Sequence, residues 1–452
     1  MHILKGYTKQ EISWMMYDWA NSAHSVIIVT LLPIFFDTVA GYTADSVSSM
    51  STWGYATSIA MLIVALAAPF LGVFGDIRGM RKKLFSFFML LGVAACAGMA
   101  FTPGMDFTSG PVAAGKVATL ILVLYIVSVI GFDASAIYYD AFLTDVTIED
   151  RMDKVSTMGY GLGYIGGSTI PLLIFLIMNL VGVPMLTCLA FVFGLTAVWW
   201  LAFSLPLLKN CEQTSGKPYE KGDVARSIKG VGTTIKEIIA NKPMLIYILS
   251  YFFYIDGVHT VISMATTYGT NLGLDSTGMM LALLLVQILG LPFCLLYIKC
   301  SEKFGARTMV GFGICVYMFI CIFAFFMNSL WQFWVLAVLC ATSQGGIQAL
   351  SRSMYGKLIP DKDRSGEFFG CFDIFGKFSS IMGPALVGVV SSVVANGMLG
   401  AQGLTAQTAT AEQIDAINAQ SSHYGILSII IIIIVGAVLY FGFLPKAEHA
   451  KQ

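Results

Sequence analysis

The chain carries a short polar stripe inside its first long apolar segment. Residues 17–25 read Tyr-Asp-Trp-Ala-Asn-Ser-Ala-His-Ser. At about 100° per residue, one face of a helix holds four of these side chains, Asp18, Asn21, Ser22 and Ser25. An ionisable group in hydrocarbon costs about 2.5–3.5 kcal/mol even on insertion scales, so it is expected to face a wet cavity or a partner. The stripe predicts a pathway for a solute or a coupling ion.

The same polar spacing recurs 238 positions later, where the matching residues are Asp256, His259, Thr260 and Ser263. An alternative offset of 235 pairs His24-Ser25 with His259-Thr260 and aligns more identical residues, but it leaves both aspartates unmatched. We adopt the offset of 238 because it pairs acid with acid. Two such stripes at corresponding places predict a duplicated bundle around a shared pathway.

A third acid, Asp133, lies deep in another apolar segment, with Ser128 and Ser135 as its nearby polar neighbours. We expect it to line the pathway; the alternative is a structural pair with Tyr138 or with a serine of another helix. Residues 159–167 place glycines four apart, which allows close helix approach.

A second trace of duplication lies in two polar loops. Residues 75–83 contain Gly75, Asp76, Gly79 and Arg81, and the last three match Glu302, Gly305 and Arg307 at an offset of 226. An acid here can accept from the amino-terminal amides of a neighbouring helix, glycine makes the turn, and arginine pairs with an acid. We predict a cytoplasmic gating loop; the alternative is a topological anchor with ordinary turn residues.

The amino-acid composition indicates the class of protein in which these residues lie. Of 452 residues 57% are hydrophobic and 12% charged, with a mean hydropathy of +0.79, whereas soluble domains are near 25% charged. Apolar runs long enough to span a bilayer predict an all-α integral membrane protein with an N-terminal six-helix bundle (1–206), a cytoplasmic linker (207–243) and a C-terminal six-helix bundle (244–452). The twelve predicted transmembrane helices are 14–40, 53–74, 84–102, 116–140, 158–180, 184–206, 244–272, 278–299, 309–327, 331–355, 371–395 and 423–444.

The basic residues predict the topology. With the amino terminus inside, 25 of the 26 Lys and Arg residues fall in cytoplasmic segments or at cytoplasmic helix ends, and Lys116 alone falls outside. This asymmetry predicts both termini in the cytoplasm and, for a bacterial chain, the inner membrane. The net charge of zero gives no reason to expect a nucleic-acid partner.

The spans also restrict the solute and the energy source. Apart from Lys116 and Lys299 at the span boundaries, their only basic residues are Arg352 and Lys377, near cytoplasmic ends, which disfavours anion exchange and favours a zwitterionic or neutral solute. No phosphate-binding loop is present and the linker is too short for a nucleotide-binding domain, so we expect no cofactor. Transport is then facilitative or driven by protons or sodium. The five scattered histidines give no enzyme motif. A monomer is expected, and a membrane sensor or scaffold stays an alternative.

Several segments resemble a known family. The loop 75–83 resembles the signature between helices 2 and 3 of the major facilitator superfamily. Five further segments resemble its autophagy-related vacuolar effluxer branch: YDWANSAHS (17–25), YYDAFLTDV (138–146), GYGLGYIGG (159–167), GGIQALSRSMYGKLIP (345–360) and EFFGCFDIFGKFSSIMGP (367–384). The resemblance implies the major facilitator fold with two pseudo-symmetric halves, alternating access, and amino acids as the solute; the alternative is a cation-coupled sugar symporter.

The chain departs from the family pattern at His24, Asp140 and Thr144. The added histidine and aspartate are open to two interpretations. In the first, they mark proton coupling or a different substrate. In the second, they are neutral changes at the boundary between membrane and water.

Overall fold

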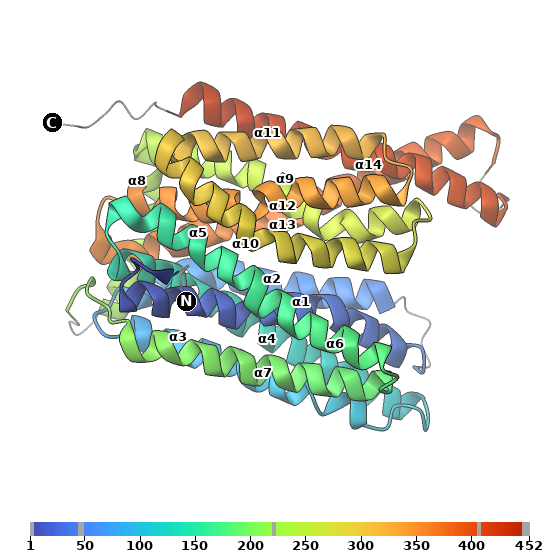
Figure 1. Cartoon of the computed structure of the whole chain (residues 1–452), viewed down its shortest axis with the longest axis horizontal. Helices are drawn as coiled ribbons and strands as arrows, with labels where there is room; N and C mark the ends of the chain where they lie inside the picture. Colours follow the sequence, from blue (N-terminus) through green and yellow to red (C-terminus); the bar gives the residue numbers. More distant parts are fainter. Residues whose placement is uncertain (1–3, 44–48, 219–222, 405–407, 445–452) are drawn as a thin grey trace. The chain divides into compact units, whose positions relative to one another are not determined.

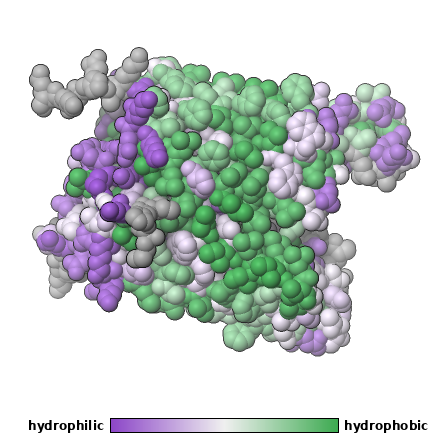
Figure 2. All heavy atoms as spheres, in the orientation of Figure 1, coloured by the Kyte–Doolittle hydropathy of each residue, from purple (hydrophilic) through white to green (hydrophobic). Residues whose placement is uncertain are grey.

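The computed structural model describes residues 4–43, 49–218, 223–404 and 408–444. The described residues form helices and loops without any strand. Twelve of these helices are long and apolar enough to cross a membrane, which confirms the predicted number of spans. On the face shown in Figure 2, apolar side chains cover the middle stretches of the helices and hydrophilic side chains gather towards their ends.

The chain divides into two compact units. Unit 1 comprises Met1–Thr234 and Ile359–Ile374, and unit 2 comprises Ile235–Leu358 and Phe375–Gln452. A short segment from the second half of the sequence, including the first turns of α13, therefore belongs to unit 1.

The helices of the first half (Figure 1) follow the predicted spans. The fifth span contains a π-helical segment, η4, between two α-helices. The bounds are α1 Lys9–Ala40, α2 Ser49–Gly75, α3 Arg81–Met99, α4 Pro111–Val146, α5 Met152–Gly163, η4 Tyr164–Thr169, α6 Ile170–Leu180 and α7 Met185–Asn210, followed by α8 Asp223–Ala240 in the linker.

The second half repeats this order. Its last helix also ends in a π-helical segment, η6. The bounds are α9 Lys242–Asn271, α10 Ser276–Phe304, α11 Ala306–Phe325, α12 Leu330–Leu358, α13 Ser365–Ala401, α14 Ala411–Val438 and η6 Leu439–Phe443.

Capping boxes explain why α1 and α14 begin earlier than hydropathy predicts. α1 begins at Lys9 because Thr8 and Glu11 form a capping box, in which each side chain bonds the other residue's backbone N–H. α14 begins at Ala411 for the same reason, through Thr410 and Gln413, twelve residues before the predicted span. Polar residues in its first turns conceal this extension from a search for apolar runs.

Within unit 1, α1 packs against α4, α5, η4 and α7. Aromatic side chains of α1 stack on aromatic side chains of α4 and α7 in these contacts. Trp14 stacks on Tyr139 of α4 with ring centroids 4.4 Å apart, and Trp19 stacks on Trp199 of α7 at 6.3 Å. Asp18 and Asn21 of the polar stripe are therefore buried within unit 1.

Candidate functional site

The carboxylate of Asp18 is fixed from α4. The Tyr139 hydroxyl donates to Oδ2 of Asp18 at 2.7 Å, and the Asp18 residue is 8% exposed. Trp14 Nε1 donates to the backbone carbonyl of Tyr139 at 2.8 Å, which holds the tyrosine in place. An acid in a spanning helix thus has a neutral hydroxyl partner.

Glycines of α5 lie directly on the α1 stripe. A Cβ atom on Gly159 would be 2.4 Å from Oδ2 of Asp18, and one on Gly163 would be 2.6 Å from Oγ of Ser22. Real Cβ atoms do not approach other atoms this closely, so a larger residue at either position would force the Asp18 or Ser22 side chain to move. Asp18 and Ser22 therefore occupy the seam between two helices.

Unit 2 contains a corresponding seam between α9 and α13. Oδ1 of Asp256 accepts from the Gly383 N–H at 2.8 Å and from the Thr260 hydroxyl at 3.3 Å. A Cβ atom on Gly383 would lie 1.8 Å from Oγ1 of Thr260. Asp256 is 0% exposed, and its Oδ2 has no hydrogen-bond partner among the described residues.

Each unit thus seats an acid of its first helix against a glycine of another helix, α5 or α13. The partners differ, because Asp18 accepts from a side-chain hydroxyl and Asp256 from a backbone amide. Sequence reasoning missed Tyr139 and Gly383 as partners. Each partner lies more than 100 residues from its acid in the chain, so no local pattern pointed to either of them.

The other predicted stripe residues have varied surroundings. Asn21 is buried and hydrogen-bonded to Tyr17, one turn earlier on α1. His259 is half-buried with Gln348 of α12 as a hydrogen-bond partner. The outer members of the two stripes, Ser25 and Ser263, are exposed. Each stripe therefore runs from a sealed seam to the surface of its unit.

Asp133 is buried on α4, and the serines near it have partners on α1. Oγ of Ser128 lies 3.2 Å from Nε2 of His24, and Oγ of Ser135 lies 2.8 Å from the Tyr17 hydroxyl. His24 also stacks on Phe132 with ring centroids 4.7 Å apart. The structure thus places His24 inside the α1–α4 contact, beside the stripe.

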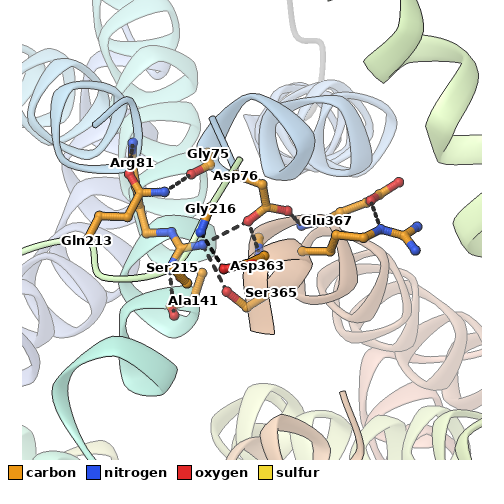
Figure 3. A network of polar contacts seen from close by, with 12 residues as sticks. Gly75, Asp76, Arg81, Ala141, Gln213, Ser215, Gly216, Asp363, Ser365 and Glu367 are labelled. Carbon is orange, nitrogen blue, oxygen red and sulfur yellow. Dashed lines mark hydrogen bonds and ion pairs between the residues drawn. The ribbon is translucent and has the colours of Figure 1, made fainter. Parts of the chain in front are cut away.

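The loop after α2 takes part in a network of polar contacts within unit 1 (Figure 3). Oδ1 of Asp76 accepts from the Gly366 N–H, and Oδ2 accepts from the Glu367 N–H, both at 2.7 Å. These amides belong to the first turn of α13, which has no intrahelical acceptors for them. Asp76 thus binds the amino terminus of α13, where the helix dipole favours a negative charge.

Arg81 lies at the centre of this network and is 0% exposed. Its guanidinium pairs with Asp145 of α4 through Nη1 and with Asp76 through Nη2, the latter at 2.8 Å. Nη2 also donates to the Ser365 hydroxyl at 2.9 Å. Asp145 was missed from the sequence because it stands 64 residues after Arg81 and repeats nothing in the second half.

The two loop glycines are fixed by their surroundings. Gly79 has a φ of +79°, a conformation that favours glycine, and a Cβ atom on Gly75 would lie 2.8 Å from the Tyr138 ring. Gln213, in the segment after α7, accepts from the Gly79 N–H at 2.9 Å and donates to the Gly75 carbonyl at 2.9 Å. The linker therefore takes part in fixing the loop.

The corresponding loop of unit 2 has different contacts. Gly305 has a φ of +84°, like Gly79, but Nη2 of Arg307 donates to the backbone carbonyl of Leu444 at 2.7 Å. The repeated residue types therefore share a turn and differ in what the arginine binds.

The contact between Asp76 and α13 should depend on pH. Burial raises the pKa of the Asp76 carboxyl to about 7, with Arg81 and the amides of Glu367 and Gly366 acting in the opposite direction. The bound state therefore takes up a proton below about pH 7, whereas a solvated carboxyl would do so near pH 4. Lowering the pH from 8 to 6 should favour the bound state by about tenfold.

This shift can be measured as hydrogen exchange of the Gly366 and Glu367 amides. The wild type should gain protection between pH 8 and 6 relative to Asp76→Asn, whose side chain does not titrate. Comparing the two proteins at each pH cancels the intrinsic pH dependence of exchange. The same pH profile in both would contradict a titrating contact.

The sequence is similar to known proteins along most of its length. A profile of the family described as Vacuole effluxer Atg22 like matches residues 7–397. The chain is 40% identical to the uncharacterized MFS-type transporter YxiO of Bacillus subtilis (strain 168), over 98% of this chain and 96% of that protein. Autophagy-related protein 22-1 of Penicillium rubens is 25% identical over 55% of this chain, and the match covers 46% of the fungal protein.

Solved structures share the fold. The proton:xylose symporter XylE has a TM-score of 0.72 at 14% identity, with 97% of this chain and 96% of that chain covered. The transporter FucP in its outward conformation has a TM-score of 0.62 at 12% identity, with 95% and 98% covered. The family match and the likeness to YxiO show a multi-pass transporter of the major facilitator superfamily, whose relatives are transporters and not enzymes. The chain belongs to the Atg22-like vacuole effluxer family.

Proposed function

We propose that this transporter moves a small zwitterionic or neutral solute, in the first place amino acids, by alternating access. The observation that carries the proposal is the pair of buried acids, Asp18 and Asp256, each seated on a glycine of a neighbouring helix. The family description, Vacuole effluxer Atg22 like, supports an effluxer, and the shortage of basic residues within the spans disfavours an anionic solute.

The seams favour a role of the two acids in coupling over direct contact with the solute. At Gly159 and Gly383 even a methyl group would collide with the neighbouring helix, so the carboxylates face helix surfaces. A proton is small enough to reach such an acid. Sodium would need several acceptor oxygens, whereas the neighbours of these carboxylates are donors: the Tyr139 hydroxyl, the Thr260 hydroxyl and the Gly383 N–H.

The loop after α2 is proposed to act as a gate on the cytoplasmic side. Asp76 holds the first turn of α13 through two amides, and Arg81 connects it to α4. Breaking these contacts would release α13 in one step of the cycle. The proposal includes a monomer in the bacterial inner membrane, with both termini in the cytoplasm as the basic residues predict.

The test is counterflow in proteoliposomes with labelled amino acids, sugars and nucleosides at pH 6 and pH 8. We expect exchange of neutral amino acids and none of anions, with net uptake that depends on the proton gradient. Exchange of sugars alone would replace the substrate assignment by that of a cation-coupled sugar symporter. No exchange by protein whose folding has been verified would favour a sensor or scaffold.

A further inference from the structure

Unit 2 contains a cavity apart from the residues assigned to transport above. A cavity of about 90 Å³ lies among α9, α10, α11, α12 and α14. None of its lining residues is charged, and small side chains such as Ala265, Ala324 and Ala337 leave the space open. The Tyr268 hydroxyl at its edge already donates to the Ala324 carbonyl at 2.6 Å.

One polar side chain in this lining has a buried acceptor atom that no described residue hydrogen-bonds. Oε1 of Gln287 is buried and has no hydrogen-bond partner among the described residues. Gln287 stands near the middle of α10, a spanning helix with predominantly apolar residues. Leaving a buried acceptor unpaired costs about 1–3 kcal/mol, which is a reason to expect a donor from elsewhere.

The chemistry of the lining narrows the choice of occupant. A buried water usually makes about three hydrogen bonds, and the lining offers it mainly the amides of Gln287 and Gln344. A lipid acyl chain fits the apolar walls but has no hydrogen to donate. An apolar body with one hydroxyl meets both conditions, because a hydroxyl can donate to an amide oxygen and accept from an amide nitrogen.

We propose that this cavity binds a small, largely apolar molecule carrying a single hydroxyl group, such as a phenol, with the hydroxyl on the Gln287 amide. The bound molecule contacts Val261 and Ala265 of α9, within two turns of the seam residue Thr260. The site is therefore placed to influence the helix that carries Asp256. This inference does not depend on the identity of the transported solute.

The test uses two probes of nearly equal shape, 4-fluorophenol and 4-fluorotoluene, with fluorine NMR of the full chain in nanodiscs. Empty nanodiscs correct for partition into lipid. The wild type should bind the phenol about tenfold more tightly than the toluene, the effect of one hydrogen bond to a buried acceptor. In Gln287→Met the preference should disappear, because methionine keeps the length of the side chain and removes the amide.

Two further variants locate the binding site. Ile288→Met changes the next residue of α10, which is 42% exposed, and should keep the preference for the phenol. Ala337→Phe fills the cavity and should abolish binding of both probes. Equal affinities of the wild type for the two probes, a preference retained in Gln287→Met, or phenol binding retained in Ala337→Phe would each overturn the proposal.

Discussion

Asp18→Asn and Asp256→Asn should each abolish proton-driven accumulation of the solute, so that its ratio across the membrane falls to about one, while the protein stays folded. Asparagine keeps the size of the side chain and can still accept from Tyr139 or from the Gly383 N–H, but it does not take up and release a proton. Counterflow, which requires no net proton movement, should persist in both variants.

Uptake in proteoliposomes with and without an imposed proton gradient measures this difference. Asp106→Asn is the matched control, because that residue lies in an exposed loop outside the spans. Wild-type accumulation with an unchanged pH dependence in both seam variants would refute the coupling assignment. Loss of counterflow as well as accumulation would show that the acids contact the solute.

Arg81→Met should destabilise the folded protein by about 3–5 kcal/mol, the usual cost of removing one partner from a buried ion pair. The substitution leaves Asp76 and Asp145 without their counter-ion in a site where Arg81 is 0% exposed. The stability can be followed by reversible unfolding in denaturant. Arg78→Met, at an exposed position of the same loop, should change stability by about 0.5 kcal/mol or less.

A combined variant separates charge from packing. Adding Asp145→Asn and Asp76→Asn to Arg81→Met removes the stranded charges and should recover part of the lost stability. If the triple variant is no more stable than Arg81→Met, the loss comes from packing around the guanidinium rather than from the unpaired carboxylates.

The contacts of Asp18 and Asp256 differ from those expected for the two polar stripes. From the sequence, each stripe was expected to face an open pathway, since polar groups in hydrocarbon need water or a partner. The structure supplies partners for both acids from within their own units, Tyr139 for Asp18 and Gly383 for Asp256. Whether the acids also line a pathway stays a prediction, and the counterflow of the two variants tests it.

The sequence predicted the helices well because each span is a local property. Length, apolar runs and the placement of basic residues are enough to give twelve spans. The ends were less accurate where a capping box extends a helix into polar sequence, as at Thr410 and Gln413. Hydropathy does not register such a cap, because capping depends on hydrogen bonds between specific side chains and backbone amides.

The sequence by itself determined the class of protein, the number of spans, the repeated acids and the repeated glycine turns. Those features depend on residue type and spacing alone. Only the tertiary structure decided what each acid touches: Tyr139 and Gly159 at Asp18, Gly383 at Asp256, and the first turn of α13 at Asp76. These partners stand more than 100 residues away in the chain, and packing of one helix on another, which no local pattern encodes, brings them together.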